Sequence, residues 1–501
     1  MPRTAIHDFH SAWLSLVQSC LREVIGKQFL TQPGSGLIAG HPVLEAAGHA
    51  LEGIIKSGFT DARTAIEAFA SHRAAQRAAA NGADTSAGPS AASGGGGTIG
   101  DCADLLAQYA LAWLFHDTDK INEIESEFKD SSCDPGWLTA IVSWLAYYWD
   151  GRSPQYVPPT ANSPKPILLP PPASADGSLR VGLLGDWGTG EPEAIAVLDQ
   201  LMQQNPDLII HVGDIYYSGT HDECVNNFLN PIIAARATYN RPIPVYNLPG
   251  NHDYYSGGAG FYGILPQLNV AIPNATIQQN SFFSLYNDNW QIEGMDTGFN
   301  DHDLFLVGED MTHLEEDEAD WHTKNIKEAR DRKVILLSHH QLFSAFIHIG
   351  EATGSGPSYE NPSLLHNLHK WQKKGHDNVV AWFWGHEHLL EVYALPGTQG
   401  VNSGLNPPIV GRCIGNSAFP VFNNVGAYTP EPDSVQLEAA PQFPSGYVQT
   451  GDDGLVYASG YALLTLGQST GTVDYYQVNF SGSIPDATSQ LLWTESIPVG
   501  V

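Results

Sequence analysis

Basic side chains are scarce in this 501-residue chain. Its 23 Lys and Arg stand against 54 Asp and Glu, which gives a formal net charge of −31. General nucleic-acid binding needs a basic footprint, and anionic lipid surfaces attract clusters of Lys and Arg. No such cluster occurs in the sequence. The charge balance therefore argues against general nucleic-acid binding and disfavours anionic lipid surfaces, but it allows phosphate as a ligand if metal ions supply the positive charge.

Cysteine is also scarce, and long apolar runs are missing. The five cysteines are scattered, odd in number and form no CxxC pair, so we expect no disulfide framework and a reducing compartment. The N-terminus lacks the basic-then-apolar order of a signal peptide, which favours a cytoplasmic protein and leaves export by another route open. The most apolar stretch, residues 136–149, is too short to span a bilayer, and we expect a buried helix there.

The apolar spacing changes twice along the chain. Residues 1–150 contain three segments with helical spacing, which predicts an N-terminal all-α domain. Residues 151–177 are proline-rich and are expected to form an extended linker, or a strap on a neighbouring surface. From 178 to 501, short apolar segments alternate with helical patterns, which predict helices at 191–204, 222–236, 316–331 and 362–375, and a hairpin is expected at 460–480. This alternation predicts an α/β catalytic domain with a largely parallel sheet covered on both faces.

Five apolar segments of the last region each end in a polar cluster. In an α/β sheet the carboxyl ends of strands converge on one crevice, so these distant clusters should meet. Carboxylates, an amide, a phenol and imidazoles suit iron, zinc or manganese, and seven such ligands suit two ions that share a carboxylate. The clusters are "GDWG" with Asp186, "GDIYY" with Asp214 and Tyr217, "GNHD" with Asn251, His252 and Asp253, "LSHH" with His339 and His340, and "GHEH" with His386 and His388.

In this order the motifs resemble those of the purple acid phosphatases, which belong to the calcineurin-like metallophosphoesterases. The resemblance covers about residues 179–395 and implies a β-sheet sandwich flanked by helices. Many other calcineurin-like enzymes have His where this chain has Gly188, and they lack the tyrosine. The resemblance implies that Asp186, Tyr217 and His388 hold Fe(III), that Asp214 bridges, and that Asn251, His339 and His386 hold a second ion, which is Fe, Zn or Mn.

The resemblance also implies a reaction. A phosphate ester binds across the metals, and a hydroxide that they hold attacks phosphorus in line. His252 is expected to protonate the leaving alkoxide or to hold a phosphate oxygen, with Asp253 orienting it. His340 is either a second substrate contact or an inward-packed neighbour. Arg412 is either a phosphate contact or a member of an ion pair, and Asp296 is expected to be structural.

Three functions stay open at this point. The first is a phosphomonoesterase acting on a phosphorylated small molecule. The second is a phosphodiesterase acting on nucleotide or phospholipid-type substrates, because the same two-metal chemistry serves both. The third is a metal-containing scaffold that acts through its helical domain, which is also a candidate surface for homodimerisation.

Overall fold

The computed structural model describes the chain from residue 151 onward with gaps, and little before it. The described residues are 143–144, 147–148, 151–302, 312–344, 349, 360–372, 378–393, 409–419, 447–450, 454–479 and 486–497. The chain divides into two compact units, and Ser153–Val501 belongs to the larger. The predicted all-α domain lies almost entirely outside the described residues. Its existence and its role in dimerisation therefore stay predictions.

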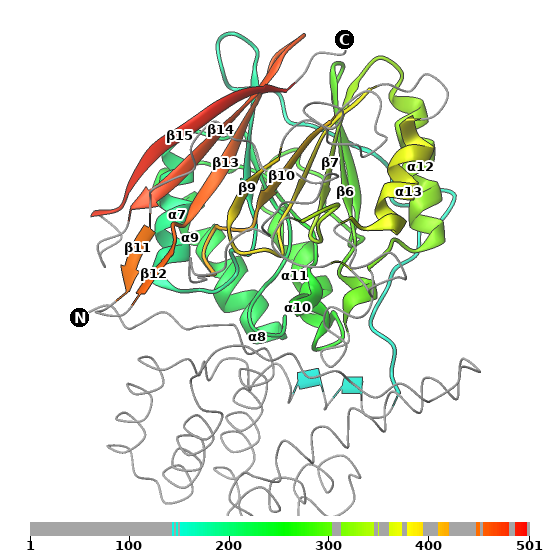
Figure 1. The fold of residues 1–501 in the computed structure, drawn as a ribbon, viewed down its shortest axis with the longest axis horizontal. Coiled ribbons are helices and arrows are strands. Elements are labelled where there is room, and N and C mark those ends of the chain that lie inside the picture. Colours follow the sequence, from blue (N-terminus) through cyan, green and yellow to red (C-terminus); the bar gives the residue numbers. More distant parts are fainter. Residues whose placement is uncertain are drawn as a thin grey trace, which may run out of the picture. The chain divides into compact units, whose positions relative to one another are not determined.

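Two β-sheets form the larger unit (Figure 1). The seven-stranded sheet has the order β1 (Ile167–Leu168), β5 (Phe283–Tyr286), β6 (Trp290–Met295), β7 (Lys333–Ser338), β8 (Val379–Trp384), β10 (Val410–Ile414) and β9 (Leu390–Val392). The six-stranded sheet has the order β15 (Thr488–Ile497), β14 (Gly471–Asn479), β13 (Gly460–Leu466), β2 (Leu179–Leu184), β3 (Leu208–His211) and β4 (Val245–Asn247). A separate hairpin pairs β11 (Tyr447–Thr450) with β12 (Gly454–Tyr457).

The two sheets pack face to face around one apolar core. Strand β7 illustrates why its sequence is apolar throughout, since successive side chains of a strand point to opposite faces. Ile335 and Leu337 lie in the core between the sheets, whereas Val334 and Leu336 pack on the outer side. A strand that is buried on both faces cannot show a polar and apolar alternation.

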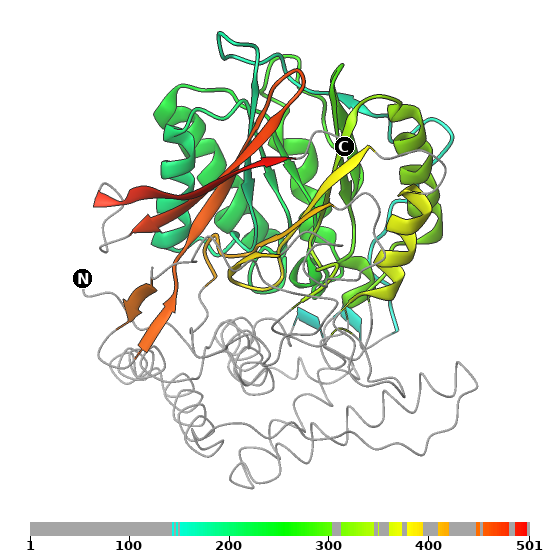
Figure 2. The ribbon, with the colours of Figure 1, turned by 45° about the horizontal axis from the view of Figure 1, so that its top comes forward.

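Helices cover the outer face of each sheet (Figure 2). The helices α12 (Glu316–Ala329) and α13 (Pro362–Gln372) pack against the seven-stranded sheet. The other sheet is covered by α7 (Pro192–Gln203), α9 (Asn230–Tyr239) and α11 (Ala259–Leu268). Shorter turns are α8 (His221–Glu223), the π-helix η2 (Cys224–Leu229), α10 (Asn251–Tyr254) and η3 (Phe299–Asp301). No helix within the described segments combines the length and apolar character needed to cross a membrane.

The α/β sandwich flanked by helices is confirmed, and both faces of each sheet are covered as expected, but the strands form two sheets and not one largely parallel sheet. Each sheet has helices on one face and the other sheet on its opposite face. Sequence periodicity reports that a face is buried, but it does not report whether a helix or a sheet buries it.

The proline-rich stretch 151–177 is a strap on the larger unit and not a free linker. Its strand β1 pairs in parallel with β5, and Ile167 and Leu169 are buried in the core between the sheets. The indole N–H of Trp321 on α12 donates to the carbonyl of Pro164 at 3.1 Å. The larger compact unit thus includes this stretch from Ser153 onward.

Candidate metal centre

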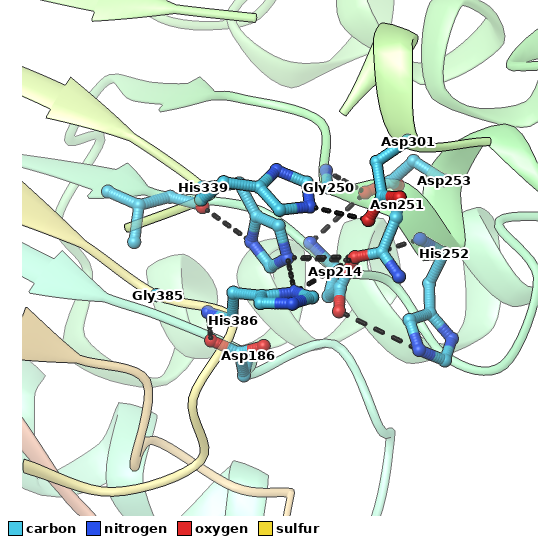
Figure 3. Close-up of polar contacts among 12 residues, drawn as sticks. Asp186, Asp214, Gly250, Asn251, His252, Asp253, Asp301, His339, Gly385 and His386 are labelled. Atoms are coloured by element: carbon cyan, nitrogen blue, oxygen red, sulfur yellow. Dashed lines mark hydrogen bonds and ion pairs between the residues drawn. The ribbon is translucent and has the colours of Figure 1, made fainter. Parts of the chain in front are cut away.

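The five predicted clusters meet at one end of the sandwich. Asp186, Asp214 and Asn251 follow β2, β3 and β4 of the six-stranded sheet, whereas His339 and His386 follow β7 and β8 of the seven-stranded sheet. These strands run so that their carboxyl ends share an edge of the sandwich. The site is therefore assembled from both sheets, as the close-up shows (Figure 3).

One set of donor atoms surrounds the hydroxyl of Tyr216. This oxygen lies 2.9 Å from Asp186 Oδ1, 3.1 Å from Asp214 Oδ2 and 3.0 Å from His388 Nε2. The same Asp186 oxygen lies 3.4 Å from His388 Nε2. We call these four residues the phenol set.

A second set of donor atoms surrounds Asn251. Its Oδ1 lies 3.1 Å from His339 Nε2 and 3.2 Å from His386 Nδ1, and the two ring nitrogens are 3.3 Å apart. Asp214 Oδ1 lies 3.4 Å from His339 Nε2. We call these residues the amide set. The two oxygens of Asp214 thus face different sets.

These spacings fit metal coordination. Donor atoms about 2.1 Å from one ion and at right angles around it are about 3 Å apart, which is the separation found within both sets. Groups of His, Asp, Glu and Cys able to hold an ion include Asp186, Asp214 and His339, and also His339, His340 and His386. The donor chemistry of the site therefore fits metal ions.

Three residues of the site have an unfavourable backbone conformation. Asp186, Asp214 and His386 have positive φ angles of 56°, 72° and 68°. Residues with side chains seldom adopt this left-handed conformation, and it concentrates at functional sites. Gly250 contributes space, because a Cβ there would collide with Asp214 Oδ1.

Burial and mutual charge set the protonation of the ligands. Burial and the neighbouring rings of His340 and His339 lower the pKa of His386 well below its ordinary value, so this ring is in the neutral form that binds metals. Burial alone would lower the pKa of His339, but the carboxylates of Asp214 and Asp186 raise it to about 9. A cation that binds His339 must therefore displace a proton.

His252 lies at the edge of the site, in contact with the phenol set. Its Nδ1 is 2.6 Å from the carbonyl oxygen of Tyr217, and its Nε2 is 3.9 Å from Asp214 Oδ2. The carbonyl accepts the Nδ1 proton, so it holds the ring with Nε2 toward the ligands. Burial lowers the pKa of His252.

Asp253 does not take the expected position against the His252 ring. Its Oδ2 accepts the backbone N–H groups of Asp214 at 3.1 Å and Gly250 at 2.8 Å. The ring contact that we expected from Asp253 is made by the Tyr217 carbonyl instead. Asp253 thus fixes the backbone of two ligand loops.

His340 is the inward-packed neighbour of the two alternatives. Its Nε2 lies 2.8 Å from Asp301 Oδ2, its Nδ1 lies 3.0 Å from the Thr297 hydroxyl, and the side chain is buried. Its ring centroid is 4.4 Å from that of His386. His340 therefore supports a ligand ring. Asp301 stands in the loop "GFND", where no sequence pattern marks it as part of the site.

Two further expectations concern residues outside the ligand sets. Arg412 is buried and pairs with Glu495, so the ion-pair alternative holds and the phosphate contact does not. Asp296 is structural, as expected. It accepts the Tyr254 hydroxyl at 2.6 Å and the Phe299 N–H at 3.0 Å, and burial raises its pKa to about 7.

The phenol that the structure places among the ligands is Tyr216, one residue before the predicted Tyr217. The described contacts of Tyr217 are made by its backbone and by its ring. The backbone N–H donates to Glu223 Oε1 at 2.6 Å, and the ring lies 5.9 Å from that of Phe419. No contact described for Tyr217 joins it to the other predicted ligands, so its assignment stays a prediction.

A family model matches part of the chain. Residues 179–390 match the model of the calcineurin-like phosphoesterases. No curated protein matches the chain.

Solved structures similar to the chain are distant from it. A purple acid phosphatase from yellow lupin seeds is 17% identical, with a TM-score of 0.40 over 65% of this chain and 55% of the lupin chain. PhoD is 13% identical, with a TM-score of 0.43 over 66% of this chain and 71% of PhoD. GAP50, the anchor in the inner membrane complex of Plasmodium, is 12% identical, with a TM-score of 0.39 over 64% and 89%. The chain thus spans about half the length of the lupin enzyme.

Proposed function

We propose that this protein is a purple acid phosphatase-like phosphomonoesterase with two metal ions. The observation that carries the proposal is that the two carboxylate oxygens of Asp214 face different donor sets. Oδ2 faces the phenol set, and Oδ1 faces the amide set. A carboxylate in this position can bridge two ions. Such a pair supplies an activated water and the positive charge that a phosphate needs. The acidic chain itself offers little of that charge.

We further propose which ions are bound. A phenolate ligand favours a trivalent ion, so Fe(III) is assigned to the phenol set. The amide set contains two imidazoles and an amide oxygen, which suit Fe, Zn or Mn. Metal binding to His339 and His386 requires both rings to be neutral, so uptake will be favoured by higher pH.

The residues of the chain position the ester and supply a proton. His252 Nε2 points toward Asp214, beside the place where an ester held by both sets would lie. A bound phosphate adds negative charge next to the ring and raises the tendency of Nε2 to hold a proton. This proton can then pass to the leaving alkoxide, which makes His252 the general acid.

The test combines metal counting with two model substrates. The purified full chain is reconstituted with iron and zinc, its metals are counted by mass spectrometry, and hydrolysis of p-nitrophenyl phosphate and bis(p-nitrophenyl) phosphate is compared. We expect two metals per chain and preference for the monoester. The matched control is His366→Gln on α13, outside both sets, against His339→Gln. A chain that binds no metal, or that binds two metals but hydrolyses neither substrate, would overturn the proposal, and preference for the diester would replace it by the phosphodiesterase alternative.

A further inference from the structure

We propose that the phenol ligand of the metal centre is Tyr216 and not Tyr217. This inference rests on the proposed two-metal function and names one ligand of it. The residue that the sequence pattern selects stands three positions after Asp214, whereas the residue that the structure places among the ligands stands two positions after it.

The contacts of the Tyr216 hydroxyl are those expected of a ligand atom. It is 2.9–3.1 Å from one donor atom each of Asp186, Asp214 and His388. Ligands of a common ion stand about 3 Å apart when their bonds are at right angles. The hydroxyl also lies on the Oδ2 side of Asp214, away from the oxygen that faces the amide set.

The ring of Tyr216 packs against two other rings. Phe419 stacks on it with centroids 4.1 Å apart and planes 25° apart, and the His252 ring lies 4.6 Å away. The side chain is fully buried. A ring packed in this way keeps its hydroxyl in one place, which a ligand requires.

The backbone of Tyr216 is fixed as well. Its N–H donates to the carbonyl of Gly188 at 2.9 Å, and its carbonyl accepts from Asn227 Nδ2 at 2.9 Å. Gly188 approaches this loop so closely that a Cβ there would lie 2.8 Å from Ile215 Cα. The absence of a side chain at residue 188 thus allows the contact that sets Tyr216.

Tyr217 has a different task in this arrangement. Its carbonyl oxygen accepts His252 Nδ1, and its N–H donates to Glu223. The two neighbouring tyrosines therefore have different roles. The side chain of Tyr216 contacts the other ligands, and the backbone carbonyl of Tyr217 accepts a hydrogen bond from the proposed general acid, His252. A tyrosine is required at 216, whereas the two polar contacts of Tyr217 named above are made by its backbone.

The experiment compares Tyr216→Phe with Tyr217→Phe in the iron-reconstituted full chain. Each change removes one hydroxyl and keeps the ring packing. A phenolate bound to Fe(III) absorbs visible light, so the spectrum reports the ligand directly. We expect Tyr217→Phe to retain the visible band, and Tyr216→Phe to lose it and to retain at least tenfold less iron after dialysis against a chelator. Thermal melts check that both variants are folded.

Three results of this experiment would overturn the inference, and a fourth would overturn the proposed function. Loss of the band in a folded Tyr217→Phe variant overturns the inference, and this variant decides the matter even if Tyr216→Phe fails to fold. Retention of the band in Tyr216→Phe also overturns it. A wild-type chain that binds two metals and hydrolyses the monoester without a visible band refutes the phenolate ligand but leaves the phosphatase intact. A wild-type chain without metal refutes the proposed function itself.

Discussion

Arg412 on β10 and Glu495 on β15 join the two sheets of the sandwich. The guanidinium donates to both carboxylate oxygens, with Nε to Oε1 at 2.8 Å and Nη2 to Oε2 at 2.6 Å. The Tyr475 hydroxyl donates to the same carboxylate at 2.6 Å. Both charged side chains are nearly buried, at 3% and 10% exposed. This pair therefore lies inside the fold, and the contacts described for it involve none of the residues of the ligand sets.

Replacing Arg412 by Leu should destabilise the protein without weakening substrate binding. The change leaves Glu495 buried without its counter-ion, which costs about 3–5 kcal/mol. Urea unfolding measures the loss, and the KM for p-nitrophenyl phosphate should stay within about twofold of wild type. A raised KM with unchanged stability would return Arg412 to the role of a phosphate contact.

Gly250→Ala should weaken metal binding, since the new Cβ would collide with Asp214 Oδ1 and come within 2.7 Å of His339 Nε2. Gly263→Ala is the matched control. It lies within α11, where a Cβ meets its nearest atom at 3.4 Å, and alanine favours a helix. Metal counting should show a loss of at least half the metal in the first variant and none in the second. A Gly250→Ala variant with its full metal content would show that metal binding does not need Asp214 Oδ1 in the position that the structure shows.

Asp214→Asn and His388→Gln should differ in the number of metals that they lose. Asp214 faces both donor sets, whereas His388 contacts only the phenol set among the described contacts. We expect the first variant to lose both ions and all measurable activity, and the second to retain one ion. Equal losses in the two variants would contradict a bridging role for Asp214.

His252→Gln should keep both metals and lower kcat by on the order of 10²-fold, the cost of a lost general acid. The loss should shrink for an ester whose leaving group needs no proton, such as p-nitrophenyl phosphate, and be largest for an alkyl phosphate. Metal content is the control measurement. Equal losses on both esters would place His252 in phosphate binding and not in proton transfer.

His322 should make the free energy of unfolding fall as the pH rises. It lies between Glu293 Oε2 at 2.6 Å and Glu318 Oε1 at 3.4 Å, all fully buried. Burial alone would lower its pKa, but these carboxylates raise it to about 9. Unfolded His loses its proton near pH 6.5, so the folded state holds more protons between these values.

The stabilisation from His322 is therefore complete below about pH 6.5 and is lost as the pH rises through about 9, with a size on the order of 3 kcal/mol. Urea unfolding at several pH values measures it. His322→Gln should flatten this part of the profile, and the His366→Gln control should not. A wild-type profile that is flat between these pH values would show that His322 is neutral in the fold.

The strand ends and their carboxylates could be predicted because apolar runs followed by Asp or His are local signals. The predicted helices at 191–204, 222–236, 316–331 and 362–375 correspond to α7, η2 with α9, α12 and α13. The hairpin at 460–480 corresponds to β13 and β14. These elements have periodic patterns or turn residues that do not depend on distant partners.

Other features depend on the tertiary structure and could not be predicted. Helix α11 contains Gly260, Gly263 and Pro266, so its sequence lacks the composition of a helix. Strand β1 is hidden among prolines and is defined only by its pairing with β5. The choice between Tyr216 and Tyr217 depends on the path of one loop, which Gly188 and Asn227 fix from elsewhere in the chain.

The order of strands in the six-stranded sheet makes the metal-binding segment depend on residues that follow it. Strand β13 lies between β14 and β2, and it pairs with β2 along Leu179–Leu183. The family match ends at residue 390, before β13. A chain that stopped there would leave one edge of β2 with unpaired N–H and carbonyl groups, which invite pairing with another chain. The C-terminal hairpin thus covers this edge of β2, and the edge is covered only after the last strands of the chain have been synthesised.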